Sequence, residues 1–487
     1  MGARQSYPRP KTEGAELVIH GIVYDISDFA KKHPGGGIIL ESLNAPGAGF
    51  PADATCAFDQ LHGHSKKPLQ WLTELKKQGR TRKLTLEERK AMMEQRPYDE
   101  KLQKSYKDAT RRLKDQGLFD YSLTEFLWRN FELVALMSWG AWCAVEPGKY
   151  FGWWHGALIL GIFMQRGGWF QHECNHGSAS KYHWLNNFVG SFWFGFCEAG
   201  SAGWWKREHN RHHADPQRHG ADIDMNTLPL ALDSITARKG FKPFLRLQAW
   251  LYQVSIWALV HVWQLWIHPK FIIRHRVITD GVFLILHWVA YFNFFVPRIG
   301  IQSAIALHIC ASAFEASLLF TNFALSHTTM PYLEYTAREH WVERSLRRTV
   351  DIHSHHKSVG PVVGFVCDKF VDWLMGFLNY QVVHHMWPLM PHYKQRDPRV
   401  HKAIQDIIDE NPELNLAYNV TTYWQAMYDM YANLSSIALD HGAGRNPDAQ
   451  HPTKPEWVRG IDPNPVDANF PKAEAKSTKV RKSAAAA

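Results

Sequence analysis

Hydrophobic and polar residues change their pattern several times along this chain of 487 residues. Over residues 16–78 short apolar runs alternate with Gly- and Pro-containing turns, which predicts a small α+β domain. Over residues 79–125 Lys, Arg and Glu interleave with Leu and Met at helical spacing, as in a solvated linker helix. Residues 1–15 contain no apolar run of the kind found in signal peptides, so we expect a flexible N-terminus there.

Longer apolar segments follow, and five are candidates for membrane helices, since about 20 apolar residues are needed to cross the hydrocarbon core. They lie at residues 131–145, 151–163, 247–267, 277–296 and 301–325. The segment 247–267 is rich in Trp and ends in His-Pro-Lys, which favours a position in the membrane interface. We therefore expect residues 126–430 to form an all-α domain with about four transmembrane helices plus an interfacial helix. Residues 431–487 are expected to be a polar, basic and partly disordered tail.

Composition narrows the class of protein. With 45% hydrophobic residues and 21 Trp the chain has enough apolar surface to fold, which excludes wholesale disorder. The formal charge of +9 accompanies no nucleic-acid motif, so we expect no nucleic-acid partner and assign the basic residues to cytoplasmic loops of a membrane protein. Six cysteines without a C-x-x-C pair indicate neither a disulfide framework nor a zinc ribbon, whereas 28 histidines indicate a metal.

Three clusters carry the candidate chemistry, and in each the members are three or four residues apart, so that they share one face of a helix. The clusters are His172 and His176, then His209, His212 and His213, then Gln381, His384 and His385. Seven imidazoles are too many for one ion, and no thiolates or bridging-glutamate motif accompany them, so two redox metals with nitrogen ligands fit best. Such a centre, supplied with electrons in an apolar setting, can activate oxygen and attack an unactivated C–H bond.

The N-terminal segment contains a candidate source of those electrons. The sequence H-P-G-G beginning at His33 and the sequence D-A-T-x-x-F at 53–58 together resemble cytochrome b5, in which two histidines are the axial haem ligands. The resemblance implies haem b held by His33 and His62. An apparent insertion around residues 44–51 leaves His64 as the alternative to His62.

Together, the boxes H-x-x-x-H, H-x-x-H-H and Q-x-x-H-H behind a cytochrome b5 segment resemble the front-end fatty acyl desaturases over about residues 16–393. The sequences WWK before the second box and DWLMG before the third also resemble that family. The resemblance implies a di-iron centre on the box histidines, with Gln381 beside it and His327 as a further ligand. It departs from the family at Val382-Val383, where Ile-Glu is usual.

The implied activity is insertion of a cis double bond, at Δ5 or Δ6, between the carboxyl end and an existing double bond of a polyunsaturated acyl chain. The implied reactants are O2, an unsaturated acyl-CoA or phospholipid-bound acyl chain, and electrons from NADH through an external cytochrome b5 reductase. Because the haem domain must reach the boxes, both should face the cytosol at a multi-pass endoplasmic reticulum membrane.

Two alternatives remain open. One is a Δ8 desaturase of sphingolipid long-chain bases, which shares the fused cytochrome b5 and the Gln-containing box. The other, from a different class, is a membrane haem protein that transfers electrons without desaturase activity. The sequence does not distinguish Δ5 from Δ6, nor does it give the chain length, the carrier of the acyl chain or the oligomeric state.

Overall fold

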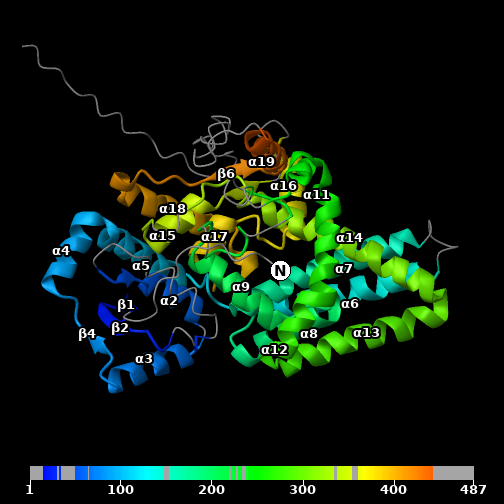
Figure 1. Cartoon of the computed structure of the whole chain (residues 1–487), viewed down its shortest axis with the longest axis horizontal. Coiled ribbons are helices and arrows are strands. Elements are labelled where there is room, and N and C mark those ends of the chain that lie inside the picture. The colour runs from blue at the N-terminus through cyan, green and yellow to red at the C-terminus, as the bar shows by residue number, and fades with distance from the viewer. Residues whose placement is uncertain are drawn as a thin grey trace, which may run out of the picture.

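The computed structural model describes residues 15–29, 32–33, 50–63, 65–146, 153–218, 221–225, 229–232, 237, 240–333, 337–353 and 360–442. In these residues a small part built on a sheet is followed by a much larger helical part (Figure 1). This order of an α+β part and a helical part confirms the predicted arrangement along the chain.

The N-terminal part is a four-stranded sheet with the strand order β3-β1-β2-β4. Its elements are β1 Glu16–Ile19, β2 Ile22–Asp25, β3 Ala52–Asp53, β4 Thr81–Arg82 and the helices α2 Thr55–His62 and α3 Lys67–Lys77. β1 and β2 form a hairpin whose two turn residues, His20 and Gly21, have φ of 51° and 76°, as a type I′ turn requires. Leu17, Tyr24 and Leu75 belong to the apolar core between sheet and helices.

Two helices connect this sheet to the larger part: α4 Leu86–Gln95 and α5 Asp99–Asp115. The sequence predicted a solvated linker, and α4 has no buried residue. α5 differs, because Leu102, Tyr106 and Leu113 are fully buried and pack in the largest apolar core. Charged residues cover only the outer face of α5, so the linker prediction is wrong for its inner face.

The larger part is helical, apart from a two-stranded parallel sheet of β5 Asp351–His353 and β6 Val420–Thr422. Its helices are α6 Leu123–Val145, α7 Trp154–His176, α8 His183–Glu198, α9 Ala202–Ala214, α11 Lys242–Val262, α12 His268–His275, α13 Ile278–Ile299, α14 Ile301–Leu325, α15 Trp341–Arg348, α16 Pro361–Leu374, α17 Gln381–Met386, α18 Pro398–Glu410 and α19 Tyr423–Gly442. A π-helix, Trp263–Ile267, joins α11 to α12.

Four long helices, α6, α7, α13 and α14, run side by side away from the N-terminal part (Figure 1). α13 and α14 are long and apolar enough to cross a membrane, and they coincide with the predicted segments 277–296 and 301–325. α6 and α7 are each 23 residues long but include charged residues such as Glu132 and Arg166. Among the described helices only two therefore meet the criterion for a span, and the count of four remains a prediction.

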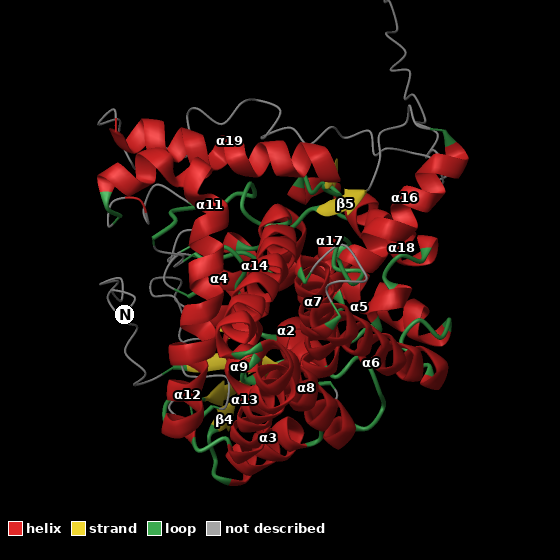
Figure 2. Ribbon diagram, turned by 90° about the vertical axis from the view of Figure 1, so that its right-hand side faces the viewer, coloured by secondary structure: helices red, strands yellow, loops and turns green. Residues whose placement is uncertain are grey.

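α11 and α19 pack against each other beside this bundle (Figure 2). α11 lies across the direction of α13 in Figure 1, and the interfacial position of segment 247–267 stays a prediction. α19 extends to residue 442, so the predicted tail boundary at residue 430 falls inside a packed helix. Met430 and Leu434 are fully buried, and the Gln248 side-chain amide donates to the Leu434 carbonyl at 2.8 Å.

Candidate metal centre and haem site

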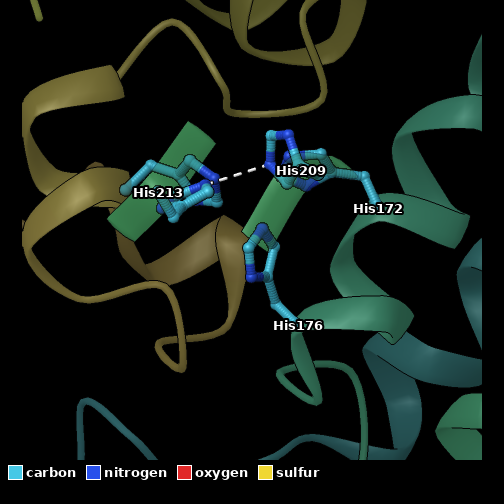
Figure 3. A group of neighbouring side chains, drawn as sticks. His172, His176, His209 and His213 are labelled. Carbon is cyan, nitrogen blue, oxygen red and sulfur yellow. Dashed lines mark hydrogen bonds between the residues drawn. The ribbon is translucent and has the colours of Figure 1, made fainter. Parts of the chain in front are cut away.

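The predicted metal ligands converge in the interior of the helical part. The first box ends α7, the second lies on α9, the third lies on α17, and His327 follows the end of α14. Figure 3 shows the first-box rings facing those of the second box across the gap between two helices. The ligands form two groups, in each of which nitrogen atoms lie within 4.8 Å of one another. These groups are His172, His176, His209, His213 and His384 on one side, and His212, His327 and His385 on the other.

Distances between nitrogen atoms suit shared cations. The Nε2 atom of His212 lies 3.3 Å from that of His327 and 3.2 Å from that of His385. In the larger group the Nε2 atoms of His209 and His213 are 3.0 Å apart (Figure 3). Two nitrogens at right angles on one ion, each roughly 2.1 Å from it, are themselves roughly 3 Å apart. The two groups therefore fit two metal ions.

The protonation of these rings also suits metal binding. Burial lowers the pKa values of His209, His213, His384 and His385 well below the ordinary value, because the charged imidazolium loses its hydration. Neutral imidazole is the form that binds a metal. The Nε2 atom of His384 and both nitrogens of His172 have no hydrogen-bond partner among the described residues, and all three are buried. These unpaired donors need a ligand, and a transition metal satisfies that need.

A carboxylate orients one ligand of the smaller group. The Oδ2 atom of Asp222 lies 2.9 Å from Nδ1 of His212 and also accepts the backbone N–H of Gln217 at 2.7 Å. Burial alone would lower the pKa of His212, but the charges of Asp222 and Asp224 outweigh it and raise the pKa to about 9. Such a carboxylate–histidine pair keeps one proton on Nδ1, so a metal that binds the ring displaces the proton of Nε2. The sequence analysis missed Asp222, which lies ten residues beyond His212 in a loop.

A further histidine borders the larger group and was also missed. The ring centroid of His392 lies 5.0 Å from that of His172 and 5.4 Å from that of His384, and the residue is fully buried. His392 begins the 3-10 helix His392–Lys394. The backbone N–H of His392 donates to Oε1 of Glu173 at 2.9 Å, which holds the residue in place. The available signal was its position seven residues after His385, next to the third box.

The packing of α17 explains how Val382 and Val383 can stand where Ile-Glu is usual in the family. Gln381 begins α17, is buried, and its side chain interacts with His327. Val382 and Val383 are fully buried in the large apolar core that includes Trp341 and Tyr106. Valine at these positions therefore fills the core, while the ligand-bearing face of α17 is retained.

The predicted haem ligands lie near each other in the N-terminal part. The ring centroids of His33 and His62 are 6.0 Å apart, with an interplanar angle of 77°. Two imidazoles on opposite sides of one iron, with metal–nitrogen bonds of roughly 2 Å, have ring centroids roughly 6 Å apart. Nδ1 of His62 lies 3.2 Å from the Phe58 carbonyl, which leaves Nε2 for the metal. His64 lies outside the described residues, as do residues 44–49 of the insertion.

The haem part packs directly on the metal-binding part. α2, which ends in His62, contacts α9 and α15, and its Cys56 and Ala57 belong to the large apolar core. The pKa of His62 is lowered chiefly by burial and also by the positive charge of Lys206 on α9. The neighbouring Trp205 stacks on His209, with ring centroids 4.2 Å apart. Both sites thus adjoin one helix, α9.

Comparison with known proteins agrees with this division. The family described as Fatty acid desaturase matches residues 151–421, and the family described as Cytochrome b5-like Heme/Steroid binding domain matches residues 10–106. The first match covers more than half of the chain.

Curated relatives extend over both parts of the chain. An "Acyl-lipid (8-3)-desaturase" of Rebecca salina is 29% identical over 429 residues, which cover 87% of this chain and 91% of the relative. A protein of the same name from Thraustochytrium sp is 29% identical, with 88% and 93% covered. A Delta(5) fatty acid desaturase of Caenorhabditis elegans is 25% identical, with 84% and 92% covered. The chain therefore belongs to the fatty acid desaturase family and carries a cytochrome b5-like domain at its N-terminus.

Proposed function

We propose that this oxidoreductase is a membrane front-end desaturase that inserts a cis double bond at Δ5 or Δ6 of a polyunsaturated acyl chain. The observation that carries the proposal is the convergence of eight histidines in two metal-sized groups next to a docked pair of haem histidines. Relatives named as (8-3), Delta(5) and Delta(6) desaturases support the reaction class. Their different names leave the position of the new double bond to experiment.

We assign each cofactor to a set of these residues. Haem b would lie between His33 and His62, and one iron would bind in each of the two histidine groups. When bound, the iron pair supplies the activation of O2 that removes two hydrogens from the acyl chain. Asp222 accepts the Nδ1–H of His212 and so directs the lone pair of Nε2 towards the ion. The surrounding buried side chains exclude water from the site.

The same geometry supports the proposed topology. His176 ends α7 and His327 follows α14, so these two helices both end at the metal centre. α6 and α13 then run in the opposite direction, which gives four spans with the boxes and the haem domain on one side. We place that side in the cytosol at the endoplasmic reticulum, with α11 in the interface. We also place the haem domain at 16–82 and the linker at 83–125, because β4 Thr81–Arg82 completes the sheet and lies beyond the boundary at 78 that the sequence predicted.

Electrons would come from NADH through an external cytochrome b5 reductase, and the substrate would be an unsaturated acyl-CoA or a phospholipid-bound acyl chain. The test is expression in yeast fed separately with linoleic, α-linolenic and dihomo-γ-linolenic acids, followed by gas chromatography of methyl esters with double-bond location. A C18 product with a new Δ6 bond or a C20 product with a new Δ5 bond supports the proposal.

Other outcomes of this experiment contradict it. A Δ8 bond in the long-chain bases without a new acyl product indicates the sphingolipid alternative. No product in either lipid pool, from protein with an intact haem spectrum, indicates the electron-transfer alternative. The variant His384→Ala, analysed in the same strain, is the negative control for endogenous activity.

A further inference from the structure

α16, a short helix in front of the third box, carries an unusual surface. Five large apolar side chains of α16 are exposed, although this is not one of the predicted membrane segments. They are Val362 at 76%, Val363 at 54%, Phe365 at 62%, Val366 at 61% and Phe370 at 56% exposure, and we call them the α16 apolar face. They fill one broad side of a 14-residue helix, whereas Val371 and Asp372 point into the protein. Contiguous exposed apolar side chains of this size mark a binding surface.

The C-terminal end of α16 is fixed to the bundle. The indole N–H of Trp373 donates to Oε1 of Glu132 on α6 at 2.6 Å. The indole N–H of Trp169 on α7 donates to the Leu374 carbonyl at 2.9 Å, and Arg166 donates to the Trp373 carbonyl. These bonds hold the end of α16 against two helices of the bundle, so the apolar face has a fixed position on its outside.

The location and length of α16 identify what covers this face. α16 lies at the periphery of the molecule in Figure 2, which views the bundle from its right-hand side in Figure 1. Next to its anchor on α6, further aromatic side chains are exposed, including Trp128 at 56% and Phe131 at 61%. The apolar face is thus continuous with the outer surface of a bundle that belongs to a membrane-associated family. Fourteen helical residues extend only about 21 Å, which is too short to cross a bilayer.

Charged groups at the edge of the face suit a lipid headgroup region. Nζ of Lys369 lies 5.2 Å from the ring centroid of Phe365, so its aliphatic stem covers apolar surface while its charge remains at the edge. Arg396, whose side chain is 42% exposed, lies 3.5 Å from the Asp372 carboxylate. Basic groups beside an inserted apolar face attract lipid phosphates.

We propose that α16 is a second interfacial helix, whose apolar face inserts among the acyl chains of the cytosolic leaflet. The insertion sets the depth of the metal centre in the membrane, because α16 is bonded to the first-box helix and leads into the third box after six residues. Given the proposed function, the metal centre is thereby held at the level of bilayer-resident acyl substrates.

Photocrosslinking tests the occupant of the face in the full-length protein in native membranes. The photoreactive amino acid p-benzoyl-L-phenylalanine replaces Phe365 or Phe370, and in a control it replaces Trp71, an aromatic residue of the haem domain that is 37% exposed. After irradiation, mass spectrometry should show phospholipid adducts on the α16 peptide of both variants. It should show none on the peptide that contains position 71 of the control. Adducts to another protein, or no adduct at either α16 position, would overturn the proposal.

A charge on the face tests its role in substrate access. Val366→Asp should raise the KM for a phospholipid-bound acyl substrate severalfold, while iron content and the haem spectrum stay unchanged. The matched control is Leu69→Asp, at a haem-domain residue that is 53% exposed. An unchanged KM in Val366→Asp would contradict the depth-setting role. A wild-type protein without desaturase activity would contradict the proposed function, while the crosslinking result would still decide the occupant.

Discussion

The two histidine sites of this protein differ in how they are held. The histidines of the metal centre are at most 6% exposed and come from helices that pack tightly on one another. His33 and His62 are only half-buried, and one follows a turn while the other ends a short helix. The rings of both sites have metal-compatible spacing, but among the described residues the metal-site histidines are the ones that lie in the interior.

This difference predicts different consequences of losing a ligand. In the metal centre α7, α9, α14 and α17 are held by packing contacts and by bonds such as that of Asp222, so the helices around the site keep their positions when one ring is removed. In the haem domain the haem itself would fill the space between the two histidines. Loss of a haem ligand should therefore remove the cofactor, whereas loss of a metal ligand should leave the fold intact.

The largest effect is expected from His384→Ala, because His384 is fully buried in the larger ligand group. Desaturase activity should fall by more than about 100-fold, since even partners that only orient a ligand contribute about 10- to 100-fold to metal affinity or activity. Iron measured by mass spectrometry should fall while the haem absorbance stays unchanged. Retained activity would show that the third box does not bind the metals.

The reciprocal variant is His62→Ala. Haem absorbance and NADH-dependent desaturation should be lost because one axial ligand is missing, and the iron of the metal centre should remain. His20→Ala is a matched control, since His20 lies in the same domain and pairs with Asp59 at 2.8 Å on the surface. If haem-free His62→Ala protein were fully active without added cytochrome b5, the electron-relay role of this domain would be wrong.

A smaller effect is expected from Asp222→Asn, which keeps the shape of the side chain but removes its charge. Metal affinity should fall about 10- to 100-fold, as for other carboxylates that orient a metal-binding histidine. Equilibrium titration of the apoprotein with Fe²⁺ measures this affinity separately from activity. Asp224→Asn should cause a smaller loss, because its carboxylate lies 3.2 Å from Nδ1 of His212 and its side chain is 41% exposed. An equal loss in both variants would argue against a specific role of Asp222.

The sequence predicted those features of the sites that follow from local geometry. Helical spacing places His209 and His213 on one face whatever surrounds them, so the boxes could be identified from the sequence. Their division into two groups depends on how the helices cross: His212 joins His327 and His385, although its neighbour His213 belongs to the other group.

Features that depend on tertiary packing were not predictable in the same way. His392 and Asp222 reach the centre from a 3-10 helix and a loop, and neither lies at a characteristic spacing within its own box. The buried face of α5 resembles that of an ordinary amphipathic helix until its partner is known, and the apolar stretch of α16 is shorter than a membrane span. In each case the sequence contains the residues, but their environment is set by distant parts of the chain.

The smallest expected effect concerns the connection between the haem domain and the linker. The two guanidinium nitrogens of Arg82 each donate to the Glu88 carboxylate at 2.7 Å, which joins β4 of the sheet to α4. The hydrogen bonds from Arg82, followed by that from the Thr85 backbone N–H, hold the pKa of Glu88 at about 2, well below its ordinary value of 4.5. Glu88→Gln should lower the free energy of unfolding of the haem domain by about 1 kcal/mol at pH 7, as for a partly exposed ion pair.

The pH dependence of this effect follows from the direction of the shift. A carboxyl group whose pKa is lower in the folded state stabilises the fold above its unfolded pKa, and this stabilisation is lost as the pH falls through the folded value. The difference in thermal stability between wild type and Glu88→Gln, measured by loss of haem absorbance, should be constant from pH 7 to pH 5. It should shrink as the pH falls from 4.5 towards 2. Glu87→Gln, which alters the neighbouring carboxylate in the first turn of α4, should show no such difference, and a difference in Glu88→Gln that persists in acid would exclude the Arg82–Glu88 bond as its cause.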